Sequence, residues 1–495
     1  TRPAGRNVFL EGPFRPVSEE KSVRCRVNGT VPESVRESVF ARVGPNPRFA
    51  PPGGYHLFDG DGMVHWVTMS SSSSSSSSSN TVSALYHNRY IRTEKLAAET
   101  RAGRSLYVNV GDFAKPLALL KIAAGELLKA FALIPDIPRS RMSVANTNIV
   151  GHGDGTLALC ESGLPYAVEL SDSGLRTAGV VSFDGFLKES LTAHPKTDPV
   201  TGRIYGFSGA GDGSNDVRVV VFHPDGSPSH SYVVPMRACT LMHDFAITSE
   251  NLVILDMPLV FSAGLLFRGR IPVEFDATRT SRLGVLDLDD TTGSSLRWYE
   301  IPGEPFMVSH VVNAHVEESG GVLTLLTCDM ETICLNRVCD SVSVLHRTTV
   351  DLSSGEVSRR PILQQDDGFR SDRSMDFPVV NPAVTGRRNR YAYVTRLRGG
   401  VPGSILKIDV VLGRVVGEIV PGPGEFTGEC CFVSDGPDED SGYIMSFVSS
   451  ASESESRLGV WCARDMSAVC SIQIPSRIPL GFHSSVLKKG RNKKE

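Results

Sequence analysis

Short apolar runs rich in β-branched residues alternate with polar clusters of Asp, Ser, Thr and Gly along most of the chain. Such a cluster between two β-branched arms predicts an antiparallel strand–turn–strand unit. The units with this pattern are Ala167–Val181, Thr197–Phe207, Val220–Val234, Leu283–Ile301, Thr349–Leu363, Ile408–Ile419 and Gly459–Ile474. From the fourth unit onward they recur about every 50–65 residues, close to the size of a four-stranded propeller blade. The pattern predicts an all-β propeller of around seven units. A tandem of β-sandwiches ranks lower, because the turns continue without a linker.

One segment breaks the alternation. Residues 115–135 contain the run PLALLKIAAGELLKAFALIP, in which Lys121 and Lys129 mark a narrow polar stripe on an otherwise apolar helix. The run is too charged to span a bilayer. It either caps the β domain through packing, which we favour, or lies in a membrane interface. Leu259–Phe267 is a second apolar segment with basic residues after it, and exposure of both segments on one face would favour membrane contact.

Two further segments bury nothing. Ser70–Ser79 is an unbroken run of ten serines between two expected strands, so we predict a disordered loop inside a hairpin. The run KKGRNKKE at 488–495 predicts a solvated, disordered tail. Chain length suggests about three domains, but the repeated units are better explained by a single domain over residues 1–495.

Charge and composition exclude several classes of protein. The 51 Lys and Arg against 55 Asp and Glu give a net charge of −4, which lacks the basic footprint of a nucleic-acid binder. With 40% hydrophobic residues, the chain is too apolar for a disordered protein. The 47 Gly and 30 Pro fit a fold with many turns. Ten cysteines without a CxxC pair indicate reduced thiols rather than disulfides or a zinc site.

Four of the twelve histidines lie in different units of the pattern, at His194, His243, His310 and His483. In a propeller, side chains from different units can converge on the axis. Imidazole nitrogen suits Fe, Cu, Zn or Ni. Spread over so much of the chain, the four have no local signature, so spacing alone does not establish a metal site.

Several long motifs occur in a fixed order along nearly the whole chain. They are ARVGPN at 41–46, GYHLFDGDGMV at 54–64, LCESGLPY around Glu161, AHPKTDP around His194, MHDFAIT around His243, SHVVNAH around His310, RRNRYAYV at 387–394, GECCF around Glu429 and PSRIPLGFH ending at His483. On these motifs the chain resembles the carotenoid cleavage dioxygenase family.

The resemblance implies a seven-bladed β-propeller with a helical cap over the axial face that holds the iron. It implies one non-haem Fe(II) bound by His194, His243, His310 and His483. It further implies that Glu161, Asp376 and Glu429 orient His243, His310 and His483 through their outer ring N–H groups, which leaves His194 without a carboxylate. His56 and His65, in the GYHLFDGDGMV region, would be structural.

Two positions depart from the family pattern. Asp376 stands where many relatives carry Glu, so either the backbone lies closer to His310 or a water bridges the two. His315 stands where relatives usually carry Trp, five residues after a ligand. An odd offset places it on the opposite face of a strand, so we expect it to be structural.

The resemblance also implies a reaction. A dioxygenase of this family consumes O2 and splits one C=C bond of a carotenoid or apocarotenoid into two carbonyl products, with no protein nucleophile or general acid. The motifs favour a plant branch that acts on apocarotenoids. The alternatives are an isomerohydrolase acting on retinoid-type esters and a non-catalytic propeller scaffold. A calcium-dependent propeller hydrolase would need an axial set of oxygen ligands, which we do not find.

The expected partners are an apolar polyene, O2 and a peripheral membrane surface reached through 117–134 and 259–267, and no nucleic acid. The chain begins at Thr1 rather than Met, which is typical of a processed product. With the plant branch that the motifs favour, we expect a plastid protein whose transit peptide has been removed, in the stroma or on a membrane surface; a cytoplasmic location is the alternative.

Overall fold

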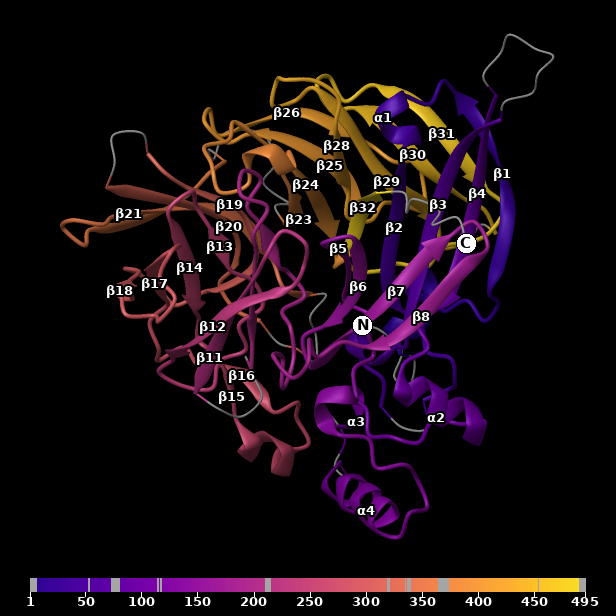
Figure 1. Ribbon diagram of the computed structural model, residues 1–495, viewed down its shortest axis with the longest axis horizontal. Helices are drawn as coiled ribbons and strands as arrows, with labels where there is room; N and C mark the ends of the chain where they lie inside the picture. Colours follow the sequence, from indigo (N-terminus) through magenta and orange to yellow (C-terminus); the bar gives the residue numbers. More distant parts are fainter. Residues whose placement is uncertain are drawn as a thin grey trace.

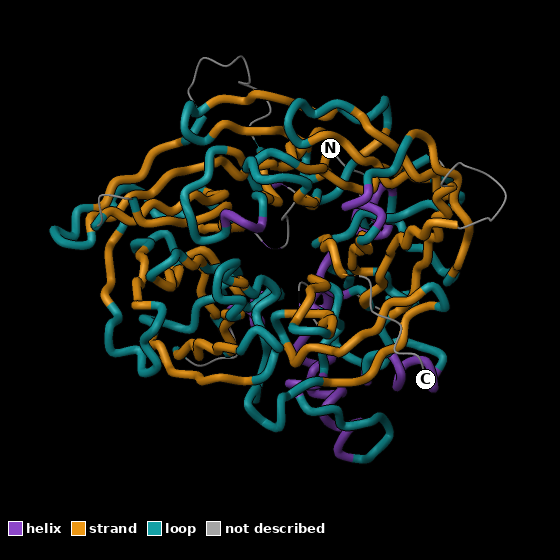
Figure 2. The backbone as a smooth tube through the Cα atoms, turned by 45° about the horizontal axis from the view of Figure 1, so that its top comes forward, coloured by secondary structure: helices purple, strands orange, loops and turns teal. Residues whose placement is uncertain are grey.

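Antiparallel sheets form a ring about a central axis in the computed structural model (Figure 2). The structure describes residues 7–51, 54–72, 81–113, 115, 118–209, 215–317, 321–333, 335, 340–363, 374–452 and 454–488. The predicted all-β class is confirmed. Each predicted strand–turn–strand unit pairs two successive strands into a hairpin.

Five separate sheets have four strands each, in which every strand pairs with its neighbours in the sheet. The first contains β5 (Asn148–His152), β6 (Gly155–Cys160), β7 (Gly163–Ser171) and β8 (Gly174–Val180). The second contains β9 (Lys196–Thr197), β10 (Ile204–Ser208), β11 (Asp216–Phe222) and β12 (Pro228–Pro235). The third contains β13 (Ala246–Ile247), β14 (Asn251–Asp256), β17 (Arg282–Asp287) and β18 (Arg297–Glu300). The fourth contains β19 (Met307–Val316), β20 (Val322–Met330), β21 (Ser343–Asp351) and β22 (Val357–Pro361). The fifth contains β23 (Met375–Val379), β24 (Tyr391–Arg398), β25 (Val401–Asp409) and β26 (Arg414–Ile419).

The remaining large sheet has ten strands and joins the two ends of the chain. It contains β1 (Lys21–Gly29), β2 (Ser38–Pro45), β3 (Gly62–Ser72), β4 (Thr81–Tyr90), β27 (Glu425–Phe426), β28 (Cys431–Ser434), β29 (Gly442–Ser450), β30 (Ser456–Cys462), β31 (Ala468–Ile474) and β32 (Ser484–Lys488). β1 pairs with β31 on one side and with β4 on the other, and β2 pairs with β32.

The prediction of seven separate blades is therefore wrong. The structure has five separate four-stranded sheets and one ten-stranded sheet, because β1 pairs with β4 on one side and with β31 on the other and so joins strands from both ends of the chain. Apolar side chains also pack between distant strands of the ten-stranded sheet, as where the rings of Phe40 in β2 and Phe447 in β29 meet edge to face with centroids 4.9 Å apart.

A helical excursion leaves the ring between β4 and β5 (Figure 1). It contains α2 (Glu94–Ala102), α3 (Val110–Phe113) and α4 (Ala118–Ala130), while the short α1 (Glu33–Arg36) lies elsewhere. The Thr93 side chain accepts from Leu96 N–H at the start of α2, and Gly103 ends the helix with φ 66°, a left-handed conformation that glycine adopts without strain. Lys95 anchors α2 to the sheet, with its Nζ 3.4 Å from Asp61 Oδ1 and 3.0 Å from Glu99 Oε2.

The favoured prediction of a cap helix buried by packing is wrong for α4. Of its residues only Ala118 is buried, and Leu120 and Leu127 are 67% and 59% exposed. One ion pair, between Lys121 Nζ and Asp112 Oδ2 at 2.5 Å, links α4 to α3. Within the described part of the chain, no helix is long and apolar enough to cross a membrane.

Two expected boundaries shift. Ser70–Ser72 belong to β3, where they pair with β4, so the loop predicted at 70–79 does not begin at its first serine. The rest of that serine run lies outside the described residues. Of the tail predicted at 488–495, Lys488 ends β32 and the remainder lies outside the described residues.

The other short elements lie in connections. A two-stranded sheet pairs β15 with β16, next to the 3₁₀ helix η5. These elements are β15 (Leu259–Phe261), η5 (Ala263–Arg268) and β16 (Val273–Phe275), and further 3₁₀ turns are η1 (Val8–Leu10), η2 (Gly12–Phe14), η3 (Leu57–Asp59), η4 (Arg139–Arg141) and η7 (Pro382–Val384).

Candidate metal centre

Four histidine side chains, carried in or just before strands of four different sheets, lie close together. His310 lies within β19, whereas His194, His243 and His483 lie just before β9, β13 and β32. One ring nitrogen from each lies within 4.8 Å of the others. The Nε2 atom of His243 is 3.2 Å from both His194 Nε2 and His310 Nε2. The structure thus brings together all four histidines that the sequence singled out, with at least three rings turned Nε2 inward.

The outer nitrogens of three of these rings face carboxylates. His243 Nδ1 contacts Glu161 Oε1. His483 Nδ1 lies 3.0 Å from Glu429 Oε1, and Glu429 Oε2 accepts a hydrogen bond from Ser484 N–H. Among the described carboxylates none forms an ion pair with His194, which matches the expectation from the motifs.

The third carboxylate contacts its ring directly. Asp376 Oδ1 lies 2.7 Å from His310 Nδ1, so the shorter side chain needs no bridging water. The register of β23 against β24 shifts between Asp376 and Val379, and Phe377 has φ 53°. Such a bulge re-aims the side chain of a strand, and here it accompanies the close approach of Asp376 to the ring.

Burial and neighbouring charges set the protonation of the cluster. Burial, together with the nearby ring of His483, holds the pKa of His194 well below its ordinary value, which leaves a neutral ring with a free lone pair. Burial opposes protonation of His243, but the neighbouring carboxylates, Glu161 foremost and then Asp244 and Asp376, together outweigh it and raise the pKa of that ring. Burial likewise disfavours charge on Asp376, yet its contact with His310 lowers the pKa of the carboxyl, so it is ionised.

The donor set fits a transition metal. Imidazole nitrogens suit iron, copper, zinc and nickel, and a metal-bound histidine characteristically gives its other N–H to a carboxylate or carbonyl. Three of the four rings have that outer partner, and one nitrogen of each of the four lies within 4.8 Å of the others. The cluster can therefore hold one metal ion.

A cavity of about 460 Å³ opens onto the cluster. His243, His310 and His483 form part of its wall, beside Glu161 and Asp376. The rest is mostly apolar and comes from distant parts of the chain, including Leu57, Val110, Phe113, Leu241, Phe261, Phe377 and Phe482. Because α3 supplies Val110 and Phe113, the helical excursion borders this cavity.

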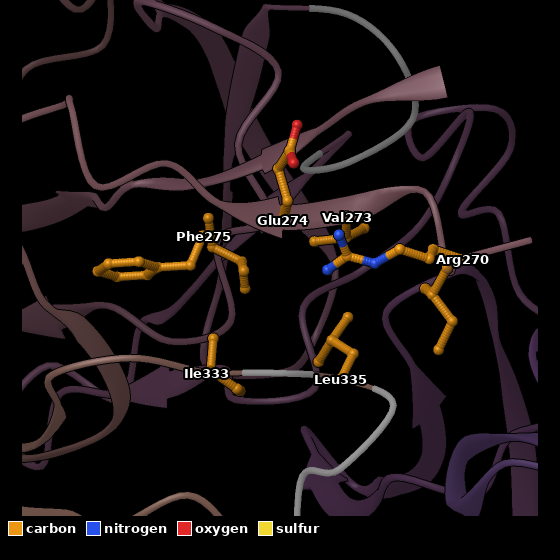
Figure 3. Close-up of a pocket in the computed structure, with 8 residues that line it drawn as sticks. Arg270, Val273, Glu274, Phe275, Ile333 and Leu335 are labelled. Carbon is orange, nitrogen blue, oxygen red and sulfur yellow. The ribbon is translucent and has the colours of Figure 1, made fainter. Parts of the chain in front are cut away.

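A smaller pocket adjoins the cavity at β15 and β16 (Figure 3). In Figure 3, Ile333 and Leu335 lie across from Val273 and Phe275 of β16. Ile333, Leu335 and Val273 line both spaces, so the two share a wall. The Leu335 carbonyl is 2.7 Å from His56 Nε2, which ties this wall to the start of η3.

His56, His65 and His315 lie outside the cluster. His56 caps η3, and His65 Nδ1 pairs with the Tyr86 hydroxyl at 2.8 Å. His315 Nε2 lies 3.2 Å from Glu317 Oε1, so its ring turns to another carboxylate. None of the three is part of the metal-binding group found among the described residues.

Sequence reasoning missed the aromatic wall of the cavity. Phe482 directly precedes His483, and Phe377 directly follows Asp376. The centroid of the Phe377 ring lies 5.4 Å from that of His310 and 5.6 Å from that of His483. The available signal is a phenylalanine directly beside two residues of the site, Asp376 and His483. The remaining lining residues have no pattern in the sequence.

Comparison with known proteins places the chain among carotenoid dioxygenases and related proteins. The family model that matches residues 14–485 describes a retinal pigment epithelial membrane protein. The carotenoid 9,10(9',10')-cleavage dioxygenase 1 of Phaseolus vulgaris is 32% identical over 96% of this chain and 88% of that protein. A 9-cis-epoxycarotenoid dioxygenase of Oryza sativa subsp. japonica, described as chloroplastic, is 34% identical over 97% of this chain and 75% of that protein.

Solved structures share the fold. Pseudomonas brassicacearum lignostilbene dioxygenase aligns with a TM-score of 0.81 at 24% identity, covering 99% of this chain and all of that one. A Synechocystis apocarotenoid oxygenase variant aligns with a TM-score of 0.78 at 23% identity, covering 96% and 98%. The ring of sheets and the histidine cluster define a propeller protein with an axial site able to bind a metal. The chain belongs to the carotenoid cleavage dioxygenase family, which confirms the resemblance read from its motifs.

Proposed function

We propose that this protein is an iron-dependent dioxygenase that uses O2 to cleave one C=C bond of a carotenoid or apocarotenoid into two carbonyl products. The observation that carries the proposal is the convergence of four histidines at the wall of an apolar cavity. The curated relatives, which are named as carotenoid dioxygenases, support the choice of reaction.

His194, His243, His310 and His483 would hold Fe(II). Four neutral rings leave the ion its full charge, and bound iron supplies a place where O2 is activated next to the substrate. Glu161, Asp376 and Glu429 accept hydrogen bonds from the outer ring N–H groups, which fixes each tautomer and keeps the inner nitrogen available. These side chains position the metal site, and the cavity needs no protein nucleophile.

The cavity determines the kind of substrate. Its wall is mainly apolar, with Phe113, Phe261, Phe377 and Phe482 among the lining residues, and these bind an uncharged polyene through the hydrophobic effect. The polyene lies beside the histidines, so the bond nearest the metal would be the one cleaved. The same wall restricts the access of water to the reacting carbons.

A membrane surface would supply such a substrate. α4 contacts η5, and apolar side chains are exposed on both: Leu120 on α4 and Phe131 directly after it are each 67% exposed, and Phe267 on η5 is 79% exposed. A patch of this kind, on a helix that is not long enough to span, fits peripheral contact with a bilayer. Chloroplastic relatives support a plastid location, where carotenoid-rich membranes lie.

The test is reconstitution. The protein is loaded with Fe(II) without oxygen, mixed with a panel of carotenoids and apocarotenoids, and exposed to ¹⁸O2, and products are identified by mass. We expect paired carbonyl products that contain label from O2. Products without O2-derived oxygen would overturn the dioxygenase proposal, and conversion of a retinyl ester in their place would favour an isomerohydrolase.

A further inference from the structure

A single buried carboxylate, Asp244, contacts chain segments that carry three of the four histidines. Its own segment follows His243 directly, and its Oδ1 accepts from Phe245 N–H at 2.8 Å. The same oxygen lies 2.7 Å from Lys196 Nζ, two residues after His194. Its Oδ2 accepts from the N–H of Val311 at 2.7 Å, one residue after His310.

These three segments come from different sheets. Lys196 lies in β9, Asp244 precedes β13 and Val311 lies in β19, and no strand pairing joins those sheets within the described ladders. Apolar packing holds neighbouring sheets together without fixing their relative height to a fraction of an ångström. Asp244 adds short, directional bonds across both gaps, and bonds to a charged group are the stronger ones.

The surroundings make these bonds costly to lose. The Asp244 side chain is 1% exposed and that of Lys196 is 19% exposed, so the pair lies largely outside water. A buried charge left without its partner is strongly unfavourable. His194, which has no carboxylate of its own among the described residues, is thereby connected to the other ligands through Lys196.

We infer that Asp244 is a positioning residue that sets the relative placement of His194, His243 and His310. This inference rests on the metal-binding role proposed for the cluster. Asp244 acts through the backbone of Val311 and through Lys196, whose segments carry the ligands, rather than by touching the metal or the substrate. Its loss would loosen the cluster even though all four rings remain.

The experiment compares metal binding by the wild-type chain and by Asp244→Asn. Asn keeps the shape but removes the charge, so we expect metal affinity to fall about tenfold or more, as for other residues that orient ligands. Affinity is measured by anaerobic titration with Fe(II) and with Co(II), whose visible absorption also reports ligand geometry. Lys196→Met should have the same direction of effect, and Lys196→Arg, which keeps the ion pair, should restore affinity.

The matched control is Asp256→Asn. The Asp256 side chain is also 1% exposed and lies 2.6 Å from Arg282 Nε, but it is outside the cluster. This control should lower the thermal midpoint and leave metal affinity unchanged. If Asp244→Asn folds and binds metal with wild-type affinity, the inference is wrong. If Asp244→Asn does not fold, wild-type metal affinity in Lys196→Met would overturn the inference instead. Failure of the wild-type protein to bind either metal would instead reject the proposed function.

Discussion

The histidine cluster and helix α4 differ in how the rest of the chain holds their side chains. Around the cluster, carboxylates from other parts of the ring fix the outer nitrogens of His243, His310 and His483. On α4, most apolar side chains contact nothing that buries them, and one lysine ties the helix to α3. The ring positions in the histidine cluster are therefore fixed by specific contacts, whereas few contacts fix the side chains of α4.

The contrast bears on the roles proposed for the two regions. Metal binding depends on ligand positions, and positions are best held by side chains that are packed and hydrogen-bonded from behind. Binding to a lipid surface depends on exposed apolar area and needs no exact geometry. The contrast predicts large, specific effects at the cluster and graded, additive ones on α4.

The largest effect is expected at a ligand. His243→Ala removes the ring whose Nε2 lies 3.2 Å from two of its neighbours, so we expect metal content and polyene turnover to fall to background. Metal content is measured by elemental analysis and turnover by product mass. His315→Ala is the matched control, because that ring pairs with Glu317 instead. If His315→Ala lost the metal and His243→Ala kept it, the ligand assignment would be wrong.

A smaller effect is expected where a carboxylate acts through a ligand. Asp376→Ala frees the Nδ1–H of His310, and we expect metal affinity to fall roughly 10- to 100-fold. Asp376→Glu should fall between alanine and wild type, since an extra methylene must fit where the contact is already 2.7 Å. Metal titration measures both. Glu317→Gln, which alters a carboxylate on a histidine outside the cluster, should bind metal as the wild type does.

The sequence predicted local features well for a physical reason. A hairpin such as Ile408–Ile419 depends on β-branched arms and a turn whose Gly413 has φ 66°, and all of that information lies within a dozen residues. The four histidines came from motifs that keep their order along the chain. Both kinds of feature are local in sequence, even when their consequence in space is not.

The features that were wrong or missed depend on distant pairings. The number of separate sheets turns on β1, whose pairing with β31 joins residues at opposite ends of the chain, and no local pattern specifies it. The exposure of Leu120 depends on what packs against α4, which an apolar pattern cannot reveal. Asp244 looked like an ordinary acidic neighbour of His243, because Lys196 and Val311 reach it only after the sheets assemble.

A moderate effect is expected from the apolar surface of α4. Replacing Leu120, Leu127 and Phe131 together by Ser should weaken binding to carotenoid-containing liposomes at least about tenfold, since each side chain forfeits apolar burial of roughly 1 kcal/mol or more. Vesicle co-sedimentation measures the change. The thermal midpoint and the metal content should stay the same, because these side chains are exposed.

The control for α4 is the replacement of three exposed apolar side chains elsewhere on the surface. Val200, Val411 and Val420 are also exposed but lie on turns and connections of the sheets rather than on the helical excursion. Their replacement by Ser should leave liposome binding unchanged. Equal weakening in both triple variants would show that association is nonspecific and would remove the membrane role proposed for α4.

The smallest effect is expected at an ion pair on α4 itself. Lys129 Nζ lies 2.7 Å from Glu126 Oε1, three residues earlier, and the Glu126 side chain is 67% exposed. Exposed pairs of this kind contribute about 0.5 kcal/mol or less. Lys129→Gln should therefore change the free energy of unfolding, measured by urea titration, within that limit.

Lys95→Gln provides the contrast: this lysine is buried between Asp61 and Glu99, and losing one partner of a buried pair costs about 3 kcal/mol. Equally small changes in the free energy of unfolding for both variants would mean that α2 is held no more firmly than α4. The contrast between firmly and loosely held regions would then not apply within the helical excursion.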